Sequence, residues 1–520
     1  MTLPLLLPLA ATALQLHLGA QCIQTDISSI DSLTFDAAQQ QLVVYRAETS
    51  GYYVPISSID SISFPQLQSY VSIRFGADIV SSVNPYYFDG LTIECSGNNV
   101  KVVSHCDFVT DIIIEGQASD ASILIEADQP IRLHLNGLEL SSSRPSIIKL
   151  AKASAATILI EGENTLRHTA SEFDRDSPEA AIFAAGQLTL SGSGALTVLT
   201  EGKVGHSLHA GSLSIEGGSF TIDNCSRGIK DIGVIYSPIA ILADETFEMS
   251  RGRLSIHATR EACKGIVCQG PVTIGPYQDT SLELDIHCIG KTLYTPGSDG
   301  HTLTEGCPAI LTTRSISIRG GIINIETADN ASQGCKAGER IDISGGQLFM
   351  QCYDDCLNSA GPITLAGGTT VCYSTGDDAI DSDYAQPGAI VIEGGNLFAY
   401  TTQGPSEEAL DCDDNSRILL RSGIVVTFGG AQHPELRNLG SNQQPYYLGP
   451  ALDDCHSGCY YSLTDPQGNP ICSFRFDHDF QSMQSLFSSP GFDPENWSIV
   501  ESSEPPSCFS ESVAGRFFLY

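Results

Sequence analysis

The chain has 520 residues and carries 61 Asp and Glu against 26 Lys and Arg, a net charge of −35. This surplus repels nucleic acid and anionic membrane surfaces and attracts cations. Hydrophobic residues make up 42% of the chain, yet no internal stretch approaches the roughly 20 apolar residues of a membrane-spanning helix. The composition therefore excludes a nucleic-acid-binding protein and an integral helical membrane protein.

Residues 1–20 contain an apolar run of signal-peptide length that ends in small residues, and they are predicted to be an export signal. The run lacks the usual basic start, because the first cation of the chain is Arg46. We expect cleavage after Ala20. A lipid anchor on Cys22 is a less favoured alternative, because Gln21 is unusual just before such a site. The protein is thus expected to be secreted or held at the cell surface, where its 17 cysteines could form disulfides.

A short internal repeat follows the export signal. Residues 26–35 return as residues 55–64 with the same Ile-Ser-Ser-Ile-Asp-Ser core, and both copies alternate apolar and polar residues, as does the stretch 41–45. Alternation with period two is typical of β-strands. We therefore predict a small β module over residues 21–86, which resembles the lead-in segment of exported proteins of the Bacteroidetes type.

A longer period dominates the centre of the chain. Short β runs separated by Gly, Ser and Asn turns begin near Tyr87, and a unit of strand, Gly-Gly pair, strand and polar turn then recurs. The first glycines of four successive pairs are Gly320, Gly345, Gly367 and Gly394, which lie 25, 22 and 27 residues apart. A period of 20–30 residues with only strands and turns is typical of a solenoid.

The period predicts an all-β fold, a right-handed parallel β-helix over residues 87–430. The glycine pairs would lie at corners of the coil, where most side chains would clash or be forced to positive φ. Beyond residue 430 the period fails and Pro-rich and aromatic segments appear. Residues 431–520 are therefore predicted to form a C-terminal β cap, with Trp497 packed in its core.

Three consecutive turns of the period are acidic and align when the Gly-Gly pairs are superposed. They read Asp354-Asp355-Cys356-Leu357-Asn358, Asp377-Asp378-Ala379-Ile380-Asp381 and Glu407-Glu408-Ala409-Leu410-Asp411, and Asp383, Asp413 and Asp414 follow closely. Equivalent residues of stacked strands lie about 4.8 Å apart. Like charges at this spacing repel by more than about 1 kcal/mol outside bulk water, so a compensating cation is expected.

Calcium is the predicted cation, because it takes about 6–8 oxygen ligands and tolerates irregular geometry. The alternative is a set of solvated acidic turns with raised carboxylate pKa values. The predicted calcium ligands are Asp354, Asp355, Asn358, Asp377, Asp378, Asp381, Glu407, Glu408, Asp411 and Asp413.

The middle residue of each acidic turn is small, Cys356, Ala379 and Ala409, and Cys335 and Cys263 occupy similar places in earlier turns. We expect a buried ladder of small residues rather than reactive or metal-binding cysteines. Lys264 and Lys336 each follow a cysteine and would point the other way, toward the surface near the acidic column. They are predicted to contact the carboxylates of a polysaccharide or to pair with the Asp residues.

These turns, set between Ile-x-Ile-x-Gly-Gly strands, resemble a bacterial family of carbohydrate-binding domains on a parallel β-helix. The motifs that carry the resemblance are Gly228-Ile-Lys230, Cys263-Lys-Gly-Ile266, Gly334-Cys-Lys-Ala337, Asp354-Asp-Cys-Leu-Asn358, Gly376-Asp-Asp-Ala-Ile-Asp381 and Ala409-Leu-Asp-Cys-Asp413. The resemblance covers about residues 87–490 and implies an architecture similar to pectate lyases, with calcium and acidic plant polysaccharide as ligands. Two departures are the segment 289–310, an insertion, and Lys336, which stands where the family often has Asp or Glu.

The predicted function is non-catalytic, calcium-dependent binding of an acidic, pectin-like polysaccharide at the cell surface. A polysaccharide lyase is one alternative and would need calcium and a base, for which Lys264 and Lys336 are candidates. A polygalacturonase-like hydrolase would use Asp329-Asn330 and the acidic pairs as acid and base, but the Gly-His-Gly element of those enzymes is missing after Asp378. A structural or adhesive rod stabilised by calcium is the third alternative.

Overall fold

The computed structural model describes residues 11–46, 51–76, 79–152, 155–169, 180–202, 205–231, 233–276, 281–297, 301–404, 407–413, 416–429, 444–452, 454–506 and 517–519. Asp414 and the first ten residues of the predicted export signal lie outside these ranges. Within them the chain is all-β and contains no α-helix, so none of the described segments offers a helix long and apolar enough to cross a membrane. Contacts divide the chain into two compact units, residues 1–199 with 209–211 and residues 200–208 with 212–520. The predicted boundaries at residues 86 and 430 remain predictions.

The first unit begins with short, mainly antiparallel strands around a small apolar core. Its elements are β1 (Ala13–Leu18), β2 (Gln21–Asp26), η1 (Ile27–Ser29), β3 (Ile30–Asp36), β4 (Gln41–Arg46), β5 (Tyr52–Pro55), η2 (Ile56–Ser58) and β6 (Ser61–Ser63). β1 pairs with β2 and β6, while β3, β4 and β5 form a separate sheet. β1 falls within the predicted export signal, and Cys22 is buried in β2; export and the lipid-anchor alternative stay predictions.

Each copy of the internal repeat contains a 3-10 turn before its strand. The alternation predicted strands throughout, whereas η1 and η2 occupy the first Ile-Ser-Ser of each copy. In the first copy the Asp26 carboxylate accepts a hydrogen bond from the Ser28 backbone N–H at 2.8 Å. Such local side-chain capping favours a turn over an extended strand. The strand that follows was predicted correctly.

The rest of the first unit consists mostly of parallel strands. Its elements are β7 (Val71–Phe75), β8 (Val80–Asn84), η3 (Tyr87–Asp89), β9 (Leu91–Ser96), β10 (Asn99–Ser104), β11 (Thr110–Ala118), β12 (Ser122–Ala127), β13 (Ile131–Ser142), β14 (Ile148–Leu150), β15 (Ala155–Glu161), β16 (Glu163–His168), β17 (Ala180–Gly192) and β18 (Ala195–Thr200). β10, β12 and β14 form one parallel stack, and β11, β13 and β15 form another. In the second stack Ile112, Leu133 and Ile158 are in register and buried. Successive repeats thus cover one another's apolar faces.

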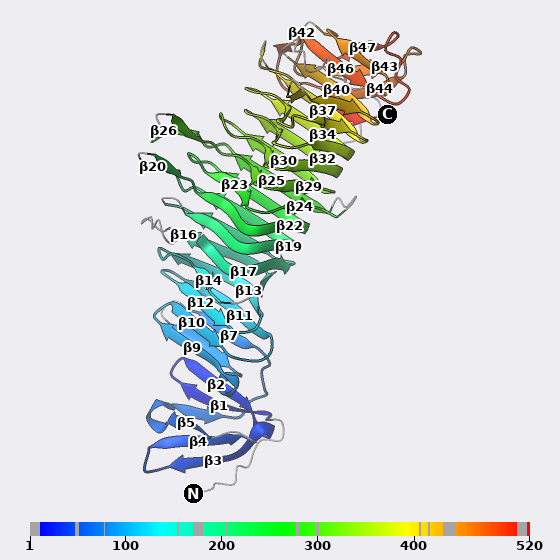
Figure 1. Ribbon diagram of the computed structural model, residues 1–520. Helices are drawn as coiled ribbons and strands as arrows, with labels where there is room; N and C mark the ends of the chain where they lie inside the picture. The colour runs from blue at the N-terminus through cyan, green and yellow to red at the C-terminus, as the bar shows by residue number, and fades with distance from the viewer. Residues whose placement is uncertain are drawn as a thin grey trace. The chain divides into compact units, whose positions relative to one another are not determined.

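The second unit continues this pattern with longer ladders. Its parallel part comprises β19 (His206–Asn224), β22 (Ile239–Ala258), β23 (Lys264–Cys268), β24 (Val272–Ile274), β25 (Leu282–Cys288), β28 (Ile310–Thr312), β29 (Ser315–Ile318), β30 (Ile322–Thr327), β31 (Cys335–Ala337), β32 (Arg340–Cys352), β33 (Leu357–Ser359), β34 (Ile363–Ser374), β35 (Ile380–Ser382), β36 (Pro387–Ile392), β37 (Asn396–Thr401), β38 (Asp411–Cys412), β39 (Arg417–Leu420) and β40 (Ile424–Gly429). Two small hairpins project from it, β20 (Ile229–Asp231) with β21 (Val234–Tyr236) and β26 (Leu293–Pro296) with β27 (Thr302–Glu305). Figure 1 shows β24, β29, β32 and β34 one after another in the main stack.

Two of the Gly-Gly pairs of the second unit, at residues 345–346 and 367–368, lie inside β32 and β34, where the register between these strands shifts. The second glycine of each pair has a positive φ, +96° at Gly321, +92° at Gly346, +76° at Gly368 and +73° at Gly395. Glycine alone adopts this region without a steric penalty from Cβ. A Cβ on Gly368 would also lie 2.5 Å from the Gly346 carbonyl oxygen of the preceding repeat. The period in the sequence therefore marks both a backbone conformation and a close approach between repeats.

An aromatic cap follows the last parallel strand. Its strands are β41 (Tyr446–Gly449), β42 (Asp454–Cys455), β43 (Tyr460–Thr464), β44 (Pro470–Arg475), β45 (Phe480–Gln481), β46 (Gln484–Ser488), β47 (Ser498–Ser502) and β48 (Phe517–Leu519). β46 pairs antiparallel with β40, so it ends the parallel stack. Trp497 packs on Tyr447 and Phe487, with ring centroids 4.6 and 5.2 Å apart, which confirms its predicted packing role.

The cysteines of the described segments are free thiols, and most are buried. Their number allowed disulfides in an exported protein, but the structure places most of the thiols inward as small apolar side chains. Burial raises the pKa of the Cys307 thiol to about 12, so this sulfur is not a ready nucleophile.

The positive φ of the second glycine in each Gly-Gly pair gives a stability prediction. Replacement Gly368→Ala should destabilise the protein more than Gly458→Ala, because both glycines have φ near +77° but only the first has backbone within reach of a new Cβ. The conformational penalty is about 1–2 kcal/mol for each variant, and overpacking adds about 1–3 kcal/mol at Gly368. Equal shifts of the two urea unfolding midpoints would contradict the close approach of the repeats.

Candidate cation and carbohydrate site

The three acidic turns lead into β33, β35 and β38, which form one parallel ladder. Asn358 is paired with Asp381, and Asp381 is paired with Asp411. The alignment predicted from the glycine pairs is therefore confirmed. Because side chains alternate along a strand, the neighbouring residues Leu357 and Ile380 point inward and are fully buried, while the polar column stands on the opposite side.

The same ladder continues toward the N-terminal repeats through β31 and β28. Leu311, Lys336 and Asn358 occupy successive positions, so Lys336 lies directly above the polar column. Its positive charge lowers the pKa of Asp381, although burial and neighbouring carboxylates outweigh this effect. Lys336 thus stands at the end of the acidic column, as expected.

Asn358 ties two of the turns together. Its side-chain Nδ2 donates to Asp355 Oδ2 at 2.9 Å and to Asp381 Oδ2 at 2.7 Å. An amide nitrogen is a donor only, so it reduces the repulsion between the two carboxylates. Asn358 therefore positions the acidic side chains through its nitrogen.

The carboxylates form two groups that share one residue. In the first group, oxygen atoms of Asp354, Asp355 and Asp377 all lie within 4.8 Å of one another, and in the second the same holds for Asp377, Asp378 and Glu407. Asp377 belongs to both groups, so carboxylate oxygens from three successive turns are brought together. Each group consists of carboxylate oxygens alone, a donor set that suits a hard cation such as calcium.

Most of these side chains are withdrawn from solvent. Asp354 and Asp355 are each 4% exposed, and Asp378 is 8% exposed. Asp354 accepts hydrogen bonds from the backbone N–H of Ala331 at 2.7 Å and from Gln333 Nε2 at 2.8 Å, and Ala331 adopts a left-handed φ of 54°. Asp378 accepts from the Glu408 backbone N–H. This burial differs from the solvated turns of the alternative, whereas the raised carboxyl pKa values that the alternative included are found.

Burial and mutual repulsion raise the pKa values of four carboxyl groups. Burial is the larger cause in each case, followed by neighbouring carboxylates, Asp354 for Asp355 and Asp411 for Asp378. The pKa rises to about 10 for Asp355, about 9 for Asp378, about 7 for Asp381 and about 6 for Asp377. In the absence of a cation, the cluster therefore retains protons at neutral pH.

The remaining predicted ligands differ in position. Glu408 is buried beside Asp378, with 3% of its surface exposed, and Asp411 is half-buried in the ladder. Asp413 lies beyond β38 and is exposed, outside both groups. The predicted ladder of small residues is confirmed, since Cys356, Ala379 and Ala409 are buried. Cys335 was predicted to belong to this ladder, but the register differs by one residue. Cys335 pairs with Leu357, and Gly334 is the residue that lies against Cys356.

Lys264 is placed differently from the prediction. Its strand, β23, is separated from β33 by β28 and β31. On β23 the residue in line with the polar column is Val267, so Lys264 is also displaced from the column along the strand. Its Nζ forms an ion pair with Glu305 Oε2 at 2.6 Å. Glu305 belongs to the segment 289–310 that interrupts the period, which is why alignment of the turns could not reveal this partner.

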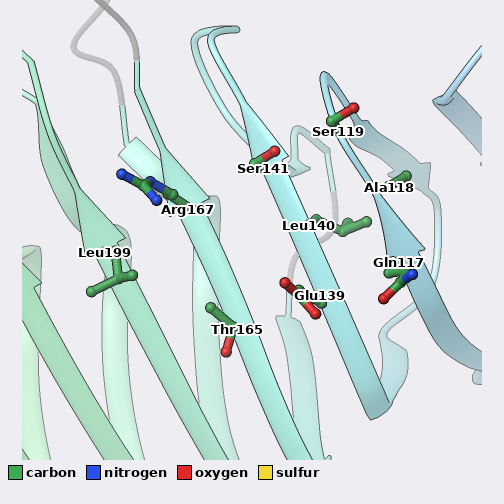
Figure 2. Close-up of a pocket in the computed structure, with 9 residues that line it drawn as sticks. All are labelled: Gln117, Ala118, Ser119, Glu139, Leu140, Ser141, Thr165, Arg167 and Leu199. Atoms are coloured by element: carbon green, nitrogen blue, oxygen red, sulfur yellow. The ribbon is translucent and has the colours of Figure 1, made fainter.

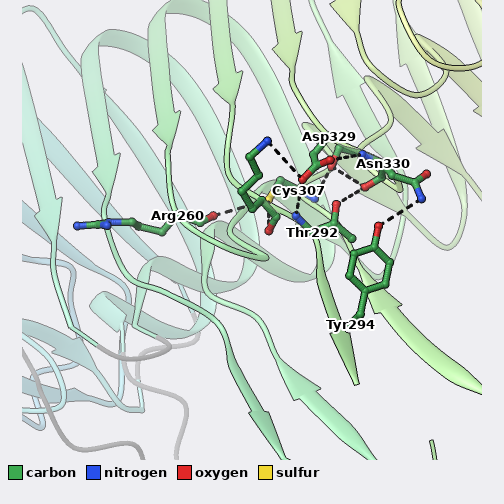
Figure 3. Close-up of polar contacts among 8 residues, drawn as sticks. Arg260, Thr292, Tyr294, Cys307, Asp329 and Asn330 are labelled. Carbon is green, nitrogen blue, oxygen red and sulfur yellow. Dashed lines mark hydrogen bonds and ion pairs between the residues drawn. The ribbon is translucent and has the colours of Figure 1, made fainter. Parts of the chain in front are cut away.

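Asp329 and Asn330 hold the same segment in place. Asp329 Oδ2 accepts from the Thr292 backbone N–H at 3.0 Å, and Asn330 Nδ2 donates to the Tyr294 hydroxyl at 3.4 Å. Figure 3 shows these contacts together with the Cys307 thiol, which donates to the Arg260 carbonyl at 3.7 Å. The hydrolase alternative used Asp329 and Asn330 as catalytic groups, whereas the structure gives them contacts that anchor a loop.

Tyr353 is a candidate binding residue that the sequence analysis missed. It directly precedes Asp354 and is 39% exposed. A Cβ on Gly376 of the next turn would meet the Tyr353 ring at 2.5 Å, so the ring lies against the glycine. The signal in the sequence was an aromatic residue before one acidic turn and a glycine before the next.

Comparison with protein families matches residues 96–379 to the family described as carbohydrate-binding domain-containing protein. A comparison with solved structures finds the polysaccharide lyase-like protein from C. thermocellum, with 17% identity and a TM-score of 0.30 over 67% of this chain and 96% of that chain. A search of curated proteins finds no match.

The family match spans more than half of the 520 residues. It includes the whole first acidic turn, Asp354 to Asn358, and the start of the second. The chain belongs to the family of carbohydrate-binding domain-containing proteins.

Proposed function

We propose that this protein is exported and binds an acidic, pectin-like polysaccharide through calcium ions without cleaving it. The observation that carries the proposal is the pair of carboxylate groups joined by Asp377. We also propose that the parallel stacks wind as a right-handed β-helix, which would present the three turns on one side. Family membership supports a carbohydrate ligand, while calcium and the acidic character of the sugar rest on the site.

The residues present fit calcium. Asp354, Asp355 and Asp377 would hold one ion, and Asp377, Asp378 and Glu407 would hold a second. No His or Cys ligand, which zinc commonly takes, belongs to either group within the described residues. Calcium usually takes about 6–8 oxygen ligands, which is more than three carboxylates provide. The free coordination positions could accept hydroxyl or carboxylate oxygens of a sugar.

Charge explains why the cation is needed for an acidic ligand. The chain has a net charge of −35, so a polyanion is repelled unless cations bridge the two. Lys336 adds a positive charge at the end of the column. The Tyr353 ring offers an apolar face beside Asp354, and the C–H face of a pyranose packs well on such a ring.

Binding without cleavage is favoured by the positions of the candidate catalytic groups. Lys264, one of the two lyase bases considered, is ion-paired with Glu305 and distant from the carboxylate groups along the ladder. Asp329 and Asn330, considered for a hydrolase, anchor the segment 291–294.

The raised pKa values predict how stability depends on pH. In chelator, the melting temperature should fall as pH rises from about 4 to about 10, because folded Asp377, Asp381, Asp378 and Asp355 keep protons that the unfolded carboxyls release near pH 4. Calcium would replace those protons. The stabilisation by calcium should therefore be larger near pH 9 than near pH 5, as measured by circular dichroism. A calcium effect independent of pH would contradict the assignment.

One substitution at Asp378 distinguishes two roles of its carboxyl group, binding a calcium ion and binding a proton. Asp378→Asn resembles the protonated carboxyl and can still accept from the Glu408 N–H. In chelator near pH 8 the variant should be at least as stable as the wild type, yet it should lose most of the calcium stabilisation, which is about 2.7 kcal/mol at 100 times Kd. Asp342→Asn, which alters an exposed carboxylate paired with Arg340, should retain it. Full calcium stabilisation in Asp378→Asn would show that this carboxylate is not a ligand.

The polysaccharide itself can be tested with polygalacturonate. Wild-type protein should be retarded in an affinity gel that contains polygalacturonate and calcium, and chelator should abolish the retardation. Tyr353→Ala should weaken binding about 3- to 10-fold through loss of ring packing, while Tyr446→Ala, at an exposed tyrosine of the cap, should not. Absence of wild-type binding would refute the proposed ligand, and release of unsaturated or reducing sugar would refute the non-catalytic function.

A further inference from the structure

A polar trough lies on the first unit, away from any predicted site. It has a volume of about 590 Å³ and is formed by residues of β11, β13, β16 and β18 and the turn after β11. Its lining residues, drawn in Figure 2, are Gln117, Ala118, Ser119, Glu139, Leu140, Ser141, Thr165, Arg167 and Leu199.

Strand register arranges the polar lining in two rows. Gln117 is paired with Glu139, and Glu139 is paired with Thr165, so these three side chains follow one another across the strands. Ser141 is paired with Arg167 in a second row, and Figure 2 shows Ser119 in line with them. The alternate residues Leu138, Leu140 and Leu166 are buried. The rows therefore stand on a rigid apolar layer, which suits preorganised binding.

The chemistry of the rows fits a sugar chain without charge. The amide, carboxylate, guanidinium and hydroxyl groups supply both donors and acceptors, as sugar hydroxyls require. One Glu and one Arg give the lining no net charge, in contrast with the acidic turns of the second unit. The other lining residues, Ala118, Leu140 and Leu199, are apolar, so the trough offers apolar surface beside the polar rows, as the hydroxyl and C–H faces of a sugar require.

We propose that this trough is a second carbohydrate site, which binds a neutral polysaccharide without calcium. A chain that crosses the strands would meet equivalent side chains about every 4.8 Å, a spacing comparable to the width of one pyranose. A neutral polymer is not repelled by the net charge of −35, so it needs no bridging cation. All lining residues fall within the matched segment 96–379. The inference is independent of the calcium proposal.

The experiment uses the full chain in affinity gels that contain hydroxyethylcellulose, xyloglucan or galactomannan, each run in chelator. At least one polymer should retard the wild type. Glu139→Ala and Arg167→Ala should each weaken that binding about tenfold or more, because each removes a charged hydrogen-bonding group. Ser141→Phe, which fills the trough, should weaken it as strongly.

The controls are Arg74→Ala and Glu94→Ala, at exposed positions of the first unit outside the trough, and Asp378→Asn. All three should bind the neutral polymer like the wild type. The proposal is overturned if none of the three polymers retards the wild type, if chelator abolishes the retardation, or if the trough variants bind normally. Polygalacturonate binding in the same variants separates this outcome from the calcium proposal, because it should depend on Asp378 and not on Arg167.

Discussion

Parallel strand register is the constraint on which the rest of this structure depends. When strands of successive repeats pair in parallel, residues at the same position stand about 4.8 Å apart and repeat the same environment. Ile266, Ile310, Cys335, Leu357 and Ile380 follow one another in this way and are all buried. At the Gly-Gly pairs of β32 and β34 the register shifts briefly and then resumes, and the second glycine of each pair has a positive φ. A slip by one residue would expose the apolar column and bury the polar one.

The same constraint forces the carboxylates together. A single acidic turn could turn its side chains to water, but three stacked turns cannot separate, because their backbones are hydrogen-bonded. The Cys356 N–H donates to the Ala379 carbonyl, and the Ala379 N–H donates to the Glu408 carbonyl, at 3.2 and 3.1 Å. The repulsion between the carboxylates can be relieved by protonation, by the N–H groups that donate hydrogen bonds to Asp354 and Asp378, or by a cation. The backbone ladder is thus the source of the raised pKa values.

The sequence predicted those features that repeat and missed those that do not. The glycine pairs and the stacked acids recur with the period, so the β class and the pairing of Asn358, Asp381 and Asp411 were predicted correctly. The partner of Lys264 could not be predicted, because Glu305 lies in a segment outside the period. The inward position of the Cys335 and Cys356 thiols was predicted, because a small residue recurs at these places in the turns, whereas the number of cysteines alone allowed disulfides. The trough was missed because Gln117, Glu139 and Thr165 come from less regular repeats without a shared motif.

The two candidate sites show how one scaffold can present different ligand chemistry. In both, register places side chains from successive strands in rows, so the spacing is the same and only the residues differ. The row of carboxylates in the acidic turns of the second unit has a surplus of negative groups, which burial and mutual repulsion keep partly protonated. The rows of the trough contain one Glu and one Arg, Glu139 and Arg167, so their lining has no net charge. Specificity between charged and neutral polymers would then follow from the electrostatics of each row rather than from its shape.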